Sequence, residues 1–301
     1  MSAEGPGPTP SEYIRHHLVH QANKKQENIV DFSIINIDSV VVASVLGMLI
    51  CFVLWRAARN SHAGVPGRFQ AAVEILVEMV DKQAKGLIHN AASRKVIAPM
   101  ALTVFLWIFM MNFMDMIPVD LFPFLWAHGI PVISDHNSAG LHAVFGAEDY
   151  MRVVPTADLS TTLGLSVGVL LMCLYYNVKI KGLGGWAHEL VSAPFGTSKN
   201  PIFAMLLGIV NFAMQMIEFV AKTVSHGMRL FGNMFAGEMV FMLIALLGGY
   251  AALSFSGGLF FIGHLITGTA WAIFHIFVIT LQAFIFMMLA LIYLGQAHDA
   301  H

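Results

Sequence analysis

The chain has 301 residues, of which 57% are hydrophobic and only 11% are charged. Soluble domains carry about 25% charged residues, and so little charge cannot cover this much apolar surface in water. We therefore expect an integral membrane protein. The formal net charge of −2 and the lack of a basic block exclude a nucleic-acid-binding protein. Cys51 and Cys173 lie in apolar stretches, which excludes a disulfide framework, and the polar residues 1–31 are no signal peptide.

Apolar segments long enough to cross a bilayer, which takes about 20 residues of helix, recur along the chain. The predicted crossings are residues 37–55, 96–116, 160–178, 202–247 and 259–294. Residues 67–90 alternate apolar and charged groups, which indicates an amphipathic helix on the membrane surface. The proline-containing residues 118–158 are expected to form an external loop. The predicted fold is an all-α membrane protein, with an outward-facing segment 1–36 before a single membrane domain 37–301.

The last two apolar segments are unusually long. As single helices they would measure about 69 Å and about 54 Å, against a hydrocarbon core of ~30 Å. A turn near Lys222 would split the first of them into two crossings, but no turn residue marks such a break. We expect both helices to be strongly tilted and to form a hairpin through residues 248–258.

Basic residues of the loops gather on one side of the predicted membrane. They are Arg56, Arg59, Arg68, Lys82, Lys85, Arg94, Lys95, Lys179, Lys181 and Lys199. The loop 118–158 on the other side contains a single basic residue, Arg152. The positive-inside rule therefore predicts a cytoplasmic carboxyl terminus and an amino terminus outside.

Polar residues form a stripe along the fourth crossing. They are Asn211, Gln215, Glu218, Lys222, Ser225, Arg229 and Asn233, each three or four residues after the last. This period places them on one helix face. His264, His275 and Gln282 repeat the pattern on the fifth crossing, so the two stripes can face each other. For the serine, asparagine and glutamine side chains, hydrogen bonding between helices is a sufficient explanation.

Arg229 needs a different explanation, because it lies within an apolar segment. An arginine at a membrane's centre costs at least ~2.5–3.5 kcal/mol, and such residues usually mark an ion pathway. Small residues surround it, and small side chains allow another helix to approach closely. These are Ser225, Gly227, Gly232, Ala236 and Gly237. One face of the helix therefore presents a charge with room for a partner.

The segment Ser225–Glu238, SHGMRLFGNMFAGE, resembles the signature of subunit a of the bacterial F-type ATP synthase. Three other parts of the chain are also similar to that family. They are residues 36–39, residues 112–120, and residues 271–275 continuing through 279–286. The resemblance covers about residues 35–296.

The resemblance implies the stator of a rotary motor that exchanges protons with carboxylates on a ring of c subunits. Such a subunit has no catalytic site of its own and needs no cofactor or metal. The resemblance also implies further partners, which are the b subunits of the peripheral stalk and the remaining synthase subunits. It implies that the chain lies in the bacterial inner membrane.

The resemblance also assigns roles to residues. Arg229 would be the fixed charge that holds a rotor carboxylate ionised and blocks proton leakage, since arginine is never deprotonated. Beside it the resemblance places Glu238, His275, Asn233 and Gln282, with Glu238 and His275 as the proton-accepting pair of the outer half-channel. Asp115 and Asp120 would line the outer mouth. Asp38 and Ser225 are expected on the exit side.

Two features depart from the family pattern. Gln215 stands where the family often has a carboxylate, and Glu218 follows one turn later, so the inner route uses Glu218 or no carboxylate there. The loop histidines His128, His136 and His142 have no common metal-ligand spacing and are read as solvated side chains.

Two other classes of protein remain open at this point. A secondary transporter would show internal repeats and helices broken by glycine or proline, and neither is visible. A haem-binding redox enzyme would need inward-facing histidine pairs, whereas the long helices contain only His226, His264 and His275. The chain has no phosphate-binding loop, because Gly182–Gly185 lacks the following Lys-Ser/Thr pair.

Overall fold

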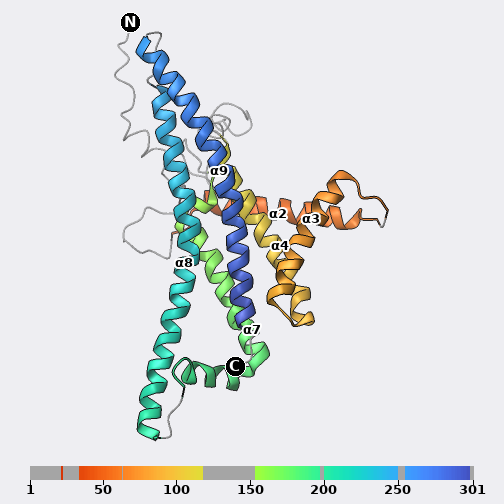
Figure 1. Ribbon diagram of the computed structural model, residues 1–301, viewed down its shortest axis with the longest axis vertical. Helices are drawn as coiled ribbons and strands as arrows, with labels where there is room; N and C mark the ends of the chain where they lie inside the picture. Colours follow the sequence, from red (N-terminus) through yellow and green to blue (C-terminus); the bar gives the residue numbers. More distant parts are fainter. Residues whose placement is uncertain are drawn as a thin grey trace, which may run out of the picture. The chain divides into compact units, whose positions relative to one another are not determined.

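The computed structural model describes residues 22, 34–62, 64–117, 153–196, 200–249 and 255–298, which are helical apart from short connections and one isolated bridge. The elements are α2 (Ile37–Arg59), α3 (Arg68–Leu87), α4 (Ala91–Phe113), the 3-10 turns η1 (Met114–Met116) and η2 (Pro155–Ala157), α7 (Leu159–Ser192), α8 (Pro201–Gly249) and α9 (Phe255–Gln296) (Figure 1). Helices α2, α4, α7, α8 and α9 are long and apolar enough to cross a membrane. The predicted all-α membrane protein with five crossing helices is confirmed.

Several helices extend beyond the apolar segments found in the sequence. Helix α2 continues to Arg59 and α4 begins at Ala91, because charged residues at a crossing's end can stay helical while their heads reach water. Helix α8 has 49 residues without a break at Lys222, and α9 has 42. The tilt of α8 and α9, the surface position of α3 and the single membrane domain stay predictions.

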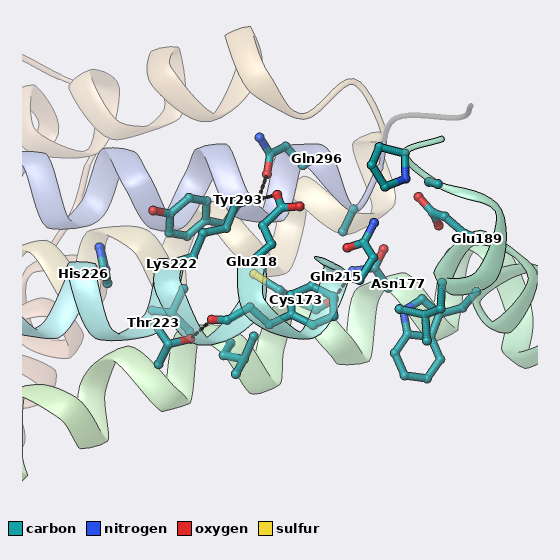
Figure 2. Close-up of a pocket in the computed structure, with 18 of the residues that line it drawn as sticks. Cys173, Asn177, Glu189, Gln215, Glu218, Lys222, Thr223, His226, Tyr293 and Gln296 are labelled. Carbon is teal, nitrogen blue, oxygen red and sulfur yellow. Dashed lines mark hydrogen bonds and ion pairs between the residues drawn. The ribbon is translucent and has the colours of Figure 1, made fainter. Parts of the chain in front are cut away.

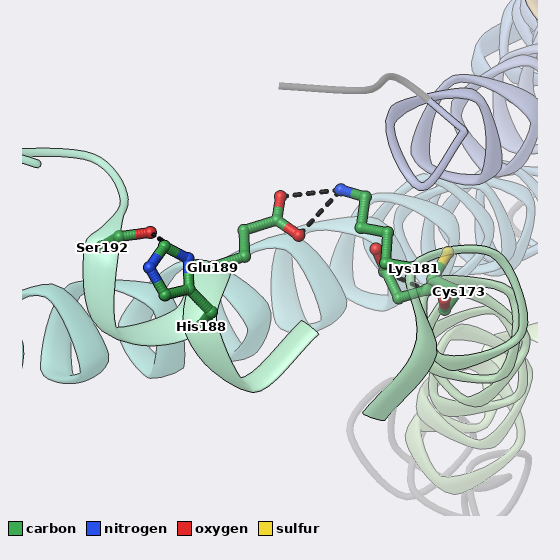
Figure 3. A network of polar contacts seen from close by, with 6 residues as sticks. Cys173, Lys181, His188, Glu189 and Ser192 are labelled. Atoms are coloured by element: carbon green, nitrogen blue, oxygen red, sulfur yellow. Dashed lines mark hydrogen bonds and ion pairs between the residues drawn. The ribbon is translucent and has the colours of Figure 1, made fainter. Parts of the chain in front are cut away.

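Helix α7 bends at Gly182, which has φ 71° and ψ 163°. A positive φ is accessible to glycine and unfavourable for residues with a Cβ atom. Across the bend, the Nζ atom of Lys181 lies 2.7 and 2.8 Å from the two carboxylate oxygens of Glu189 (Figure 3). This ion pair joins the two arms of the helix. With the second arm, α7 ends at Ser192, 14 residues past the predicted end of the third crossing, Val178.

The chain divides into two compact units, each made of parts of several helices. Unit 1 comprises residues 1–50, 107–161 and 231–283, and unit 2 comprises residues 51–106, 162–230 and 284–301. In unit 1, the indole Nε1 of Trp107 on α4 donates a hydrogen bond to the carbonyl oxygen of Ala43 on α2 (2.8 Å). Gly47 gives the indole ring its space, since a Cβ atom there would lie 3.3 Å from it.

In unit 2, helices α7 and α8 pack closely at small residues. A Cβ atom on Gly227 would lie 2.9 Å from the Leu163 side chain and 3.2 Å from the carbonyl oxygen of Thr162. The hydroxyl of Ser166 donates to the carbonyl oxygen of Thr223 (2.5 Å). Gly227 is one of the small residues predicted to let another helix approach. The helix that approaches it is α7 of the same chain.

Candidate proton-exchange sites

An aspartate and a histidine meet inside unit 1. The Oδ2 atom of Asp115 lies 2.6 Å from Nε2 of His275, and their side chains are 4% and 1% exposed. Asp115 sits in η1, the tight turn that ends α4, while His275 lies within α9. A carboxylate this close to an imidazole can accept a hydrogen bond from its N–H or hold it as a cation. The pair is thus suited to taking up and releasing protons.

Helix α8 completes the surroundings of this pair. Any side chain on Gly237 would collide with the His275 ring, as a Cβ atom would lie 2.9 Å from Nδ1 and 3.0 Å from Nε2. The next residue, Glu238, is buried. Phe241 meets the His275 ring edge-on at 5.2 Å, and Trp271 stacks on it at 6.0 Å between centroids. The apolar rings separate the acid–imidazole pair from solvent on these sides.

Other polar residues of unit 1 form hydrogen bonds between helices or are buried. The side-chain amide of Asn233 on α8 donates to Gln282 Oε1 on α9 (2.6 Å), so the predicted facing of the two stripes is realised at this point. Asp38 is fully buried at the start of α2, and its Oδ1 accepts a hydrogen bond from the backbone N–H of Ser39 (2.7 Å). Asn112 is fully buried as well, and neither side-chain polar atom has a hydrogen-bond partner among the described residues. Asp120 lies outside the described residues.

Arg229 lies on an exposed face of α8 with no hydrogen bond or ion pair to any residue that the structure describes. Its exposed neighbours on this face are Ser225, Gly232, Asn233 and Ala236. Three of these neighbours have small side chains, so the helix surface around the guanidinium carries little bulk. In a membrane such a charge requires an opposite charge or water nearby. None of the described residues supplies such an opposite charge to Arg229.

Unit 2 contains a cavity of about 710 Å³ between α7, α8 and α9 (Figure 2). Gln215 and Glu218 line it, together with Lys222, His226 and Tyr293. The Nζ of Lys222 contacts Glu218 Oε1 at 2.6 Å and donates to Gln296 Oε1 at 2.9 Å. Glu218 is therefore paired with a cation, and so is Glu189, the other carboxylate of the lining, which contacts Lys181.

The polar stripe predicted on α8 has members with different surroundings. Asn211 is tied to the end of α7, since its amide donates to the carbonyl oxygens of Val191 (2.8 Å) and Gly196 (3.2 Å) and accepts from the backbone N–H of Phe195 (3.2 Å). Its environment is structural. On α9, His264 donates its Nδ1–H to the carbonyl oxygen of Ile244 (2.7 Å). No group of three metal-ligating side chains occurs in the described parts of the chain.

Five apolar crossing helices, with a buried acid–imidazole pair and an arginine that has no partner among the described residues, define a multi-pass membrane protein of the ion-conducting class. Residues 40–295 match the family model described as ATP synthase A chain. The chain belongs to the ATP synthase subunit a family. It is 69% identical to ATP synthase subunit a of Paracidovorax citrulli, 66% to that of an Acidovorax species and 64% to that of Verminephrobacter eiseniae, each over the full length of both chains.

Membership of this family settles the general role of the chain. Subunit a is the proton-translocating stator subunit of the F-type ATP synthase, a membrane subunit without a catalytic site of its own. Its partners are other subunits of the synthase. The alternative of a secondary transporter is not favoured. The roles of individual residues are a separate question, to which the geometry of the two units contributes.

Proposed function

We propose that the chain passes protons through two offset half-channels to and from carboxylates on a ring of c subunits. In this proposal the buried polar residues of unit 1 form the outer half-channel and the cavity of unit 2 forms the inner one. The amino terminus faces outward and the carboxyl terminus faces the cytoplasm, as the distribution of loop charges predicts. The b subunits of the peripheral stalk hold the chain stationary against the ring.

The outer route starts from Asp115 and Asp120 and uses Glu238 and His275 to accept protons. The 2.6 Å contact between Asp115 and His275 and the burial of Glu238 support this assignment. Asn233 and Gln282 hold α8 and α9 together beside this route.

The observation that carries the proposal is the exposed guanidinium of Arg229, which has no partner among the described residues, on a small-residue face of a membrane helix. A guanidinium does not lose its proton at physiological pH, so Arg229 does not relay protons. Its charge favours the ionised form of a rotor carboxylate that passes within about 4–6 Å. The same charge repels a proton that would cross directly from one half-channel to the other.

The inner route leads through the cavity of unit 2 toward the cytoplasm. Ser225 lies one turn from Arg229, and Gln215 and Glu218 line the cavity further along α8. Because Glu218 is paired with Lys222, it acts as a polar wall that keeps water in the cavity more than as a proton acceptor. Asp38, at the start of α2, is also proposed on the exit side.

The test replaces Arg229 by lysine and by alanine. We expect both variants to abolish proton-coupled ATP synthesis, because lysine offers a different geometry and its ammonium can lose a proton when buried. Alanine should in addition allow passive proton flux through the membrane sector, and lysine less so. The measurements are ATP synthesis in membrane vesicles and proton flux after the soluble sector has been stripped away.

A matched control is Lys179→Gln, which removes a cation that lies over the rings of Tyr175 and Tyr176. This variant should synthesise ATP at close to the normal rate. Sustained synthesis in the alanine variant of Arg229 would show that the arginine is structural and that the proposed mechanism is wrong.

A further inference from the structure

His226 is the buried imidazole of the unit 2 cavity. Its side chain lines the cavity while the residue as a whole is 2% exposed. Neither ring nitrogen has a hydrogen-bond partner among the described residues. Figure 2 shows it on α8 at one end of the cavity, with Glu189 at the other end. A buried ring with two unpaired nitrogens is unfavourable, so the cavity is expected to supply water to them.

Packing alone does not explain a histidine at this position. The ring lies against Phe286 with centroids 3.8 Å apart, and it meets the Tyr293 ring at 5.8 Å. A phenylalanine would make these aromatic contacts without burying two polar nitrogens. The imidazole is also three residues from Arg229, which places the two side chains about one helical turn apart. The titratable group thus stands between the cavity and the proposed rotor contact.

We propose that His226 is a proton-exchanging residue at the membrane end of the inner half-channel, an inference that rests on the proposed function of the cavity. One ring nitrogen accepts the proton that a rotor carboxylic acid gives up. The other ring nitrogen releases its proton to water in the cavity. The ring ends neutral with its tautomer exchanged, the rotor group is left as a carboxylate beside Arg229, and one proton has moved toward the cytoplasm.

The charged neighbours of the ring favour passage of the proton over its retention. On α8, Lys222 lies one turn before His226 and Arg229 one turn after it, and Glu218 is paired with Lys222. The titratable groups that line the cavity from α9 and α7 are Tyr293, Cys173 and Glu189, and Glu189 is paired with Lys181. Both carboxylates that line the cavity, Glu218 and Glu189, are already paired with lysines, so neither competes with water in the cavity for the proton.

The experiment measures ATP-driven proton pumping in everted vesicles of the whole synthase, in which the cytoplasmic side faces the medium. His226→Phe keeps the aromatic packing and removes the exchangeable proton. We expect it to lower the initial pumping rate by about tenfold or more. His226→Ala leaves a space, and we expect imidazole added to the medium to restore its pumping in part. Phe286→Leu is the matched control, since it disturbs the packing and keeps the imidazole, and it should pump normally without an effect of imidazole.

Two results would overturn the inference. One is normal pumping by His226→Phe across the pH range of the medium. The other is a loss of pumping in His226→Ala that imidazole does not relieve, which would indicate a packing role. The amount of assembled synthase in the vesicles is measured in parallel. If His226→Phe does not assemble, His226→Gln replaces it, because glutamine is polar and cannot carry the proton.

The Arg229→Ala variant in the same vesicles separates this inference from the proposed function. Pumping that continues in Arg229→Ala contradicts the proposed function as a whole. Pumping that stops in Arg229→Ala but is normal in His226→Phe contradicts only the role of His226.

Discussion

The contact between Asp115 and His275 shows how one residue pair depends on three helical segments. The aspartate comes from the turn after α4 and the histidine from α9, and Gly237 of α8 leaves the space that the imidazole occupies. Both side chains are almost fully buried, so each provides the other's polar environment. Removing one partner of a buried polar pair leaves the other unsatisfied, which typically costs about 1–3 kcal/mol. The pair is expected to behave as a unit.

We predict that Asp115→Asn and His275→Gln each lower ATP-driven proton pumping strongly, and that the double variant is little worse than the poorer single variant. Groups that act together have non-additive effects, since either loss already disables the pair. The measurement is the initial rate of proton uptake by everted vesicles. Effects that multiply in the double variant would mean that the two residues act independently.

Asp158→Asn is the control for this prediction. Asp158 is another buried carboxylate of unit 1, and it accepts hydrogen bonds from the backbone N–H of Ser160 and the hydroxyl of Thr161 at the start of α7. It has no place in the proposed route, so its variant should pump at close to the normal rate.

The sequence predicted shared helix faces well but did not predict what covers each face. The three- and four-residue spacing placed Arg229 and Asn233 on one face of α8, and both are exposed there. It did not reveal that Asn211 is held by the end of α7 or that Glu218 is paired with Lys222, because both depend on neighbours in space. Asn112 and His226 were not selected as sites. The available signal was a lone polar residue within an apolar helix, which alone does not distinguish a buried unpaired group from a packed one.

At the scale of elements, α7 and α8 show two responses to a long apolar sequence. Helix α8 remains unbroken for 49 residues, as the lack of a turn residue at Lys222 predicted. Helix α7 bends at Gly182. The sequence Gly-Leu-Gly-Gly at this point excludes a phosphate-binding loop, but it did not lead us to predict a bend. Three glycines in four residues permit a bend, but which of them adopts a positive φ is set by the contacts of the two arms. The Lys181–Glu189 ion pair is one of those contacts.

We predict that Gly182→Ala destabilises the chain by about 1–2 kcal/mol, because a Cβ atom is unfavourable at a positive φ. Gly184→Ala is the matched control, as Gly184 lies in the same segment with no positive φ and no atom within 4 Å of an added Cβ. The measurement is the thermal stability of the purified synthase membrane sector in detergent. The temperature at which this chain is released from the sector reports that stability. Equal stability of the two variants would show that the bend is not maintained by Gly182.

At the scale of the whole molecule, five crossings could be predicted and the division into two compact units could not. Each crossing is a local property, since about 20 apolar residues are enough to identify it. The units join parts of helices far apart in sequence, such as residues 107–161 with 231–283 in unit 1. Such groupings arise from side-chain packing between helices, which one sequence does not specify by its periodicity.

We predict the topology from the charges of the loops. In a variant lacking Cys51 and Cys173, a cysteine at His136 should react with an impermeant thiol reagent applied to intact cells. A cysteine at the exposed residue Lys82 should react only in everted vesicles. The physical reason is the concentration of lysine and arginine on the side of Lys82. The reverse labelling pattern would contradict both the orientation and the naming of the half-channels as outer and inner.

Helix α8 leaves unit 2 after Leu230 and enters unit 1 at Phe231 without any interruption of its turns. Each residue of a helix advances the chain by 100° and about 1.5 Å. One residue inserted or deleted between Arg229 and Asn233 would therefore swing Glu238 to a different side of the helix while Arg229 stayed in place. A helix cannot accommodate such a change locally, because its backbone conformation is fixed, whereas a loop can change its conformation. Between Arg229 and Glu238 the number of residues is therefore as much a part of the proposed site as the side chains themselves.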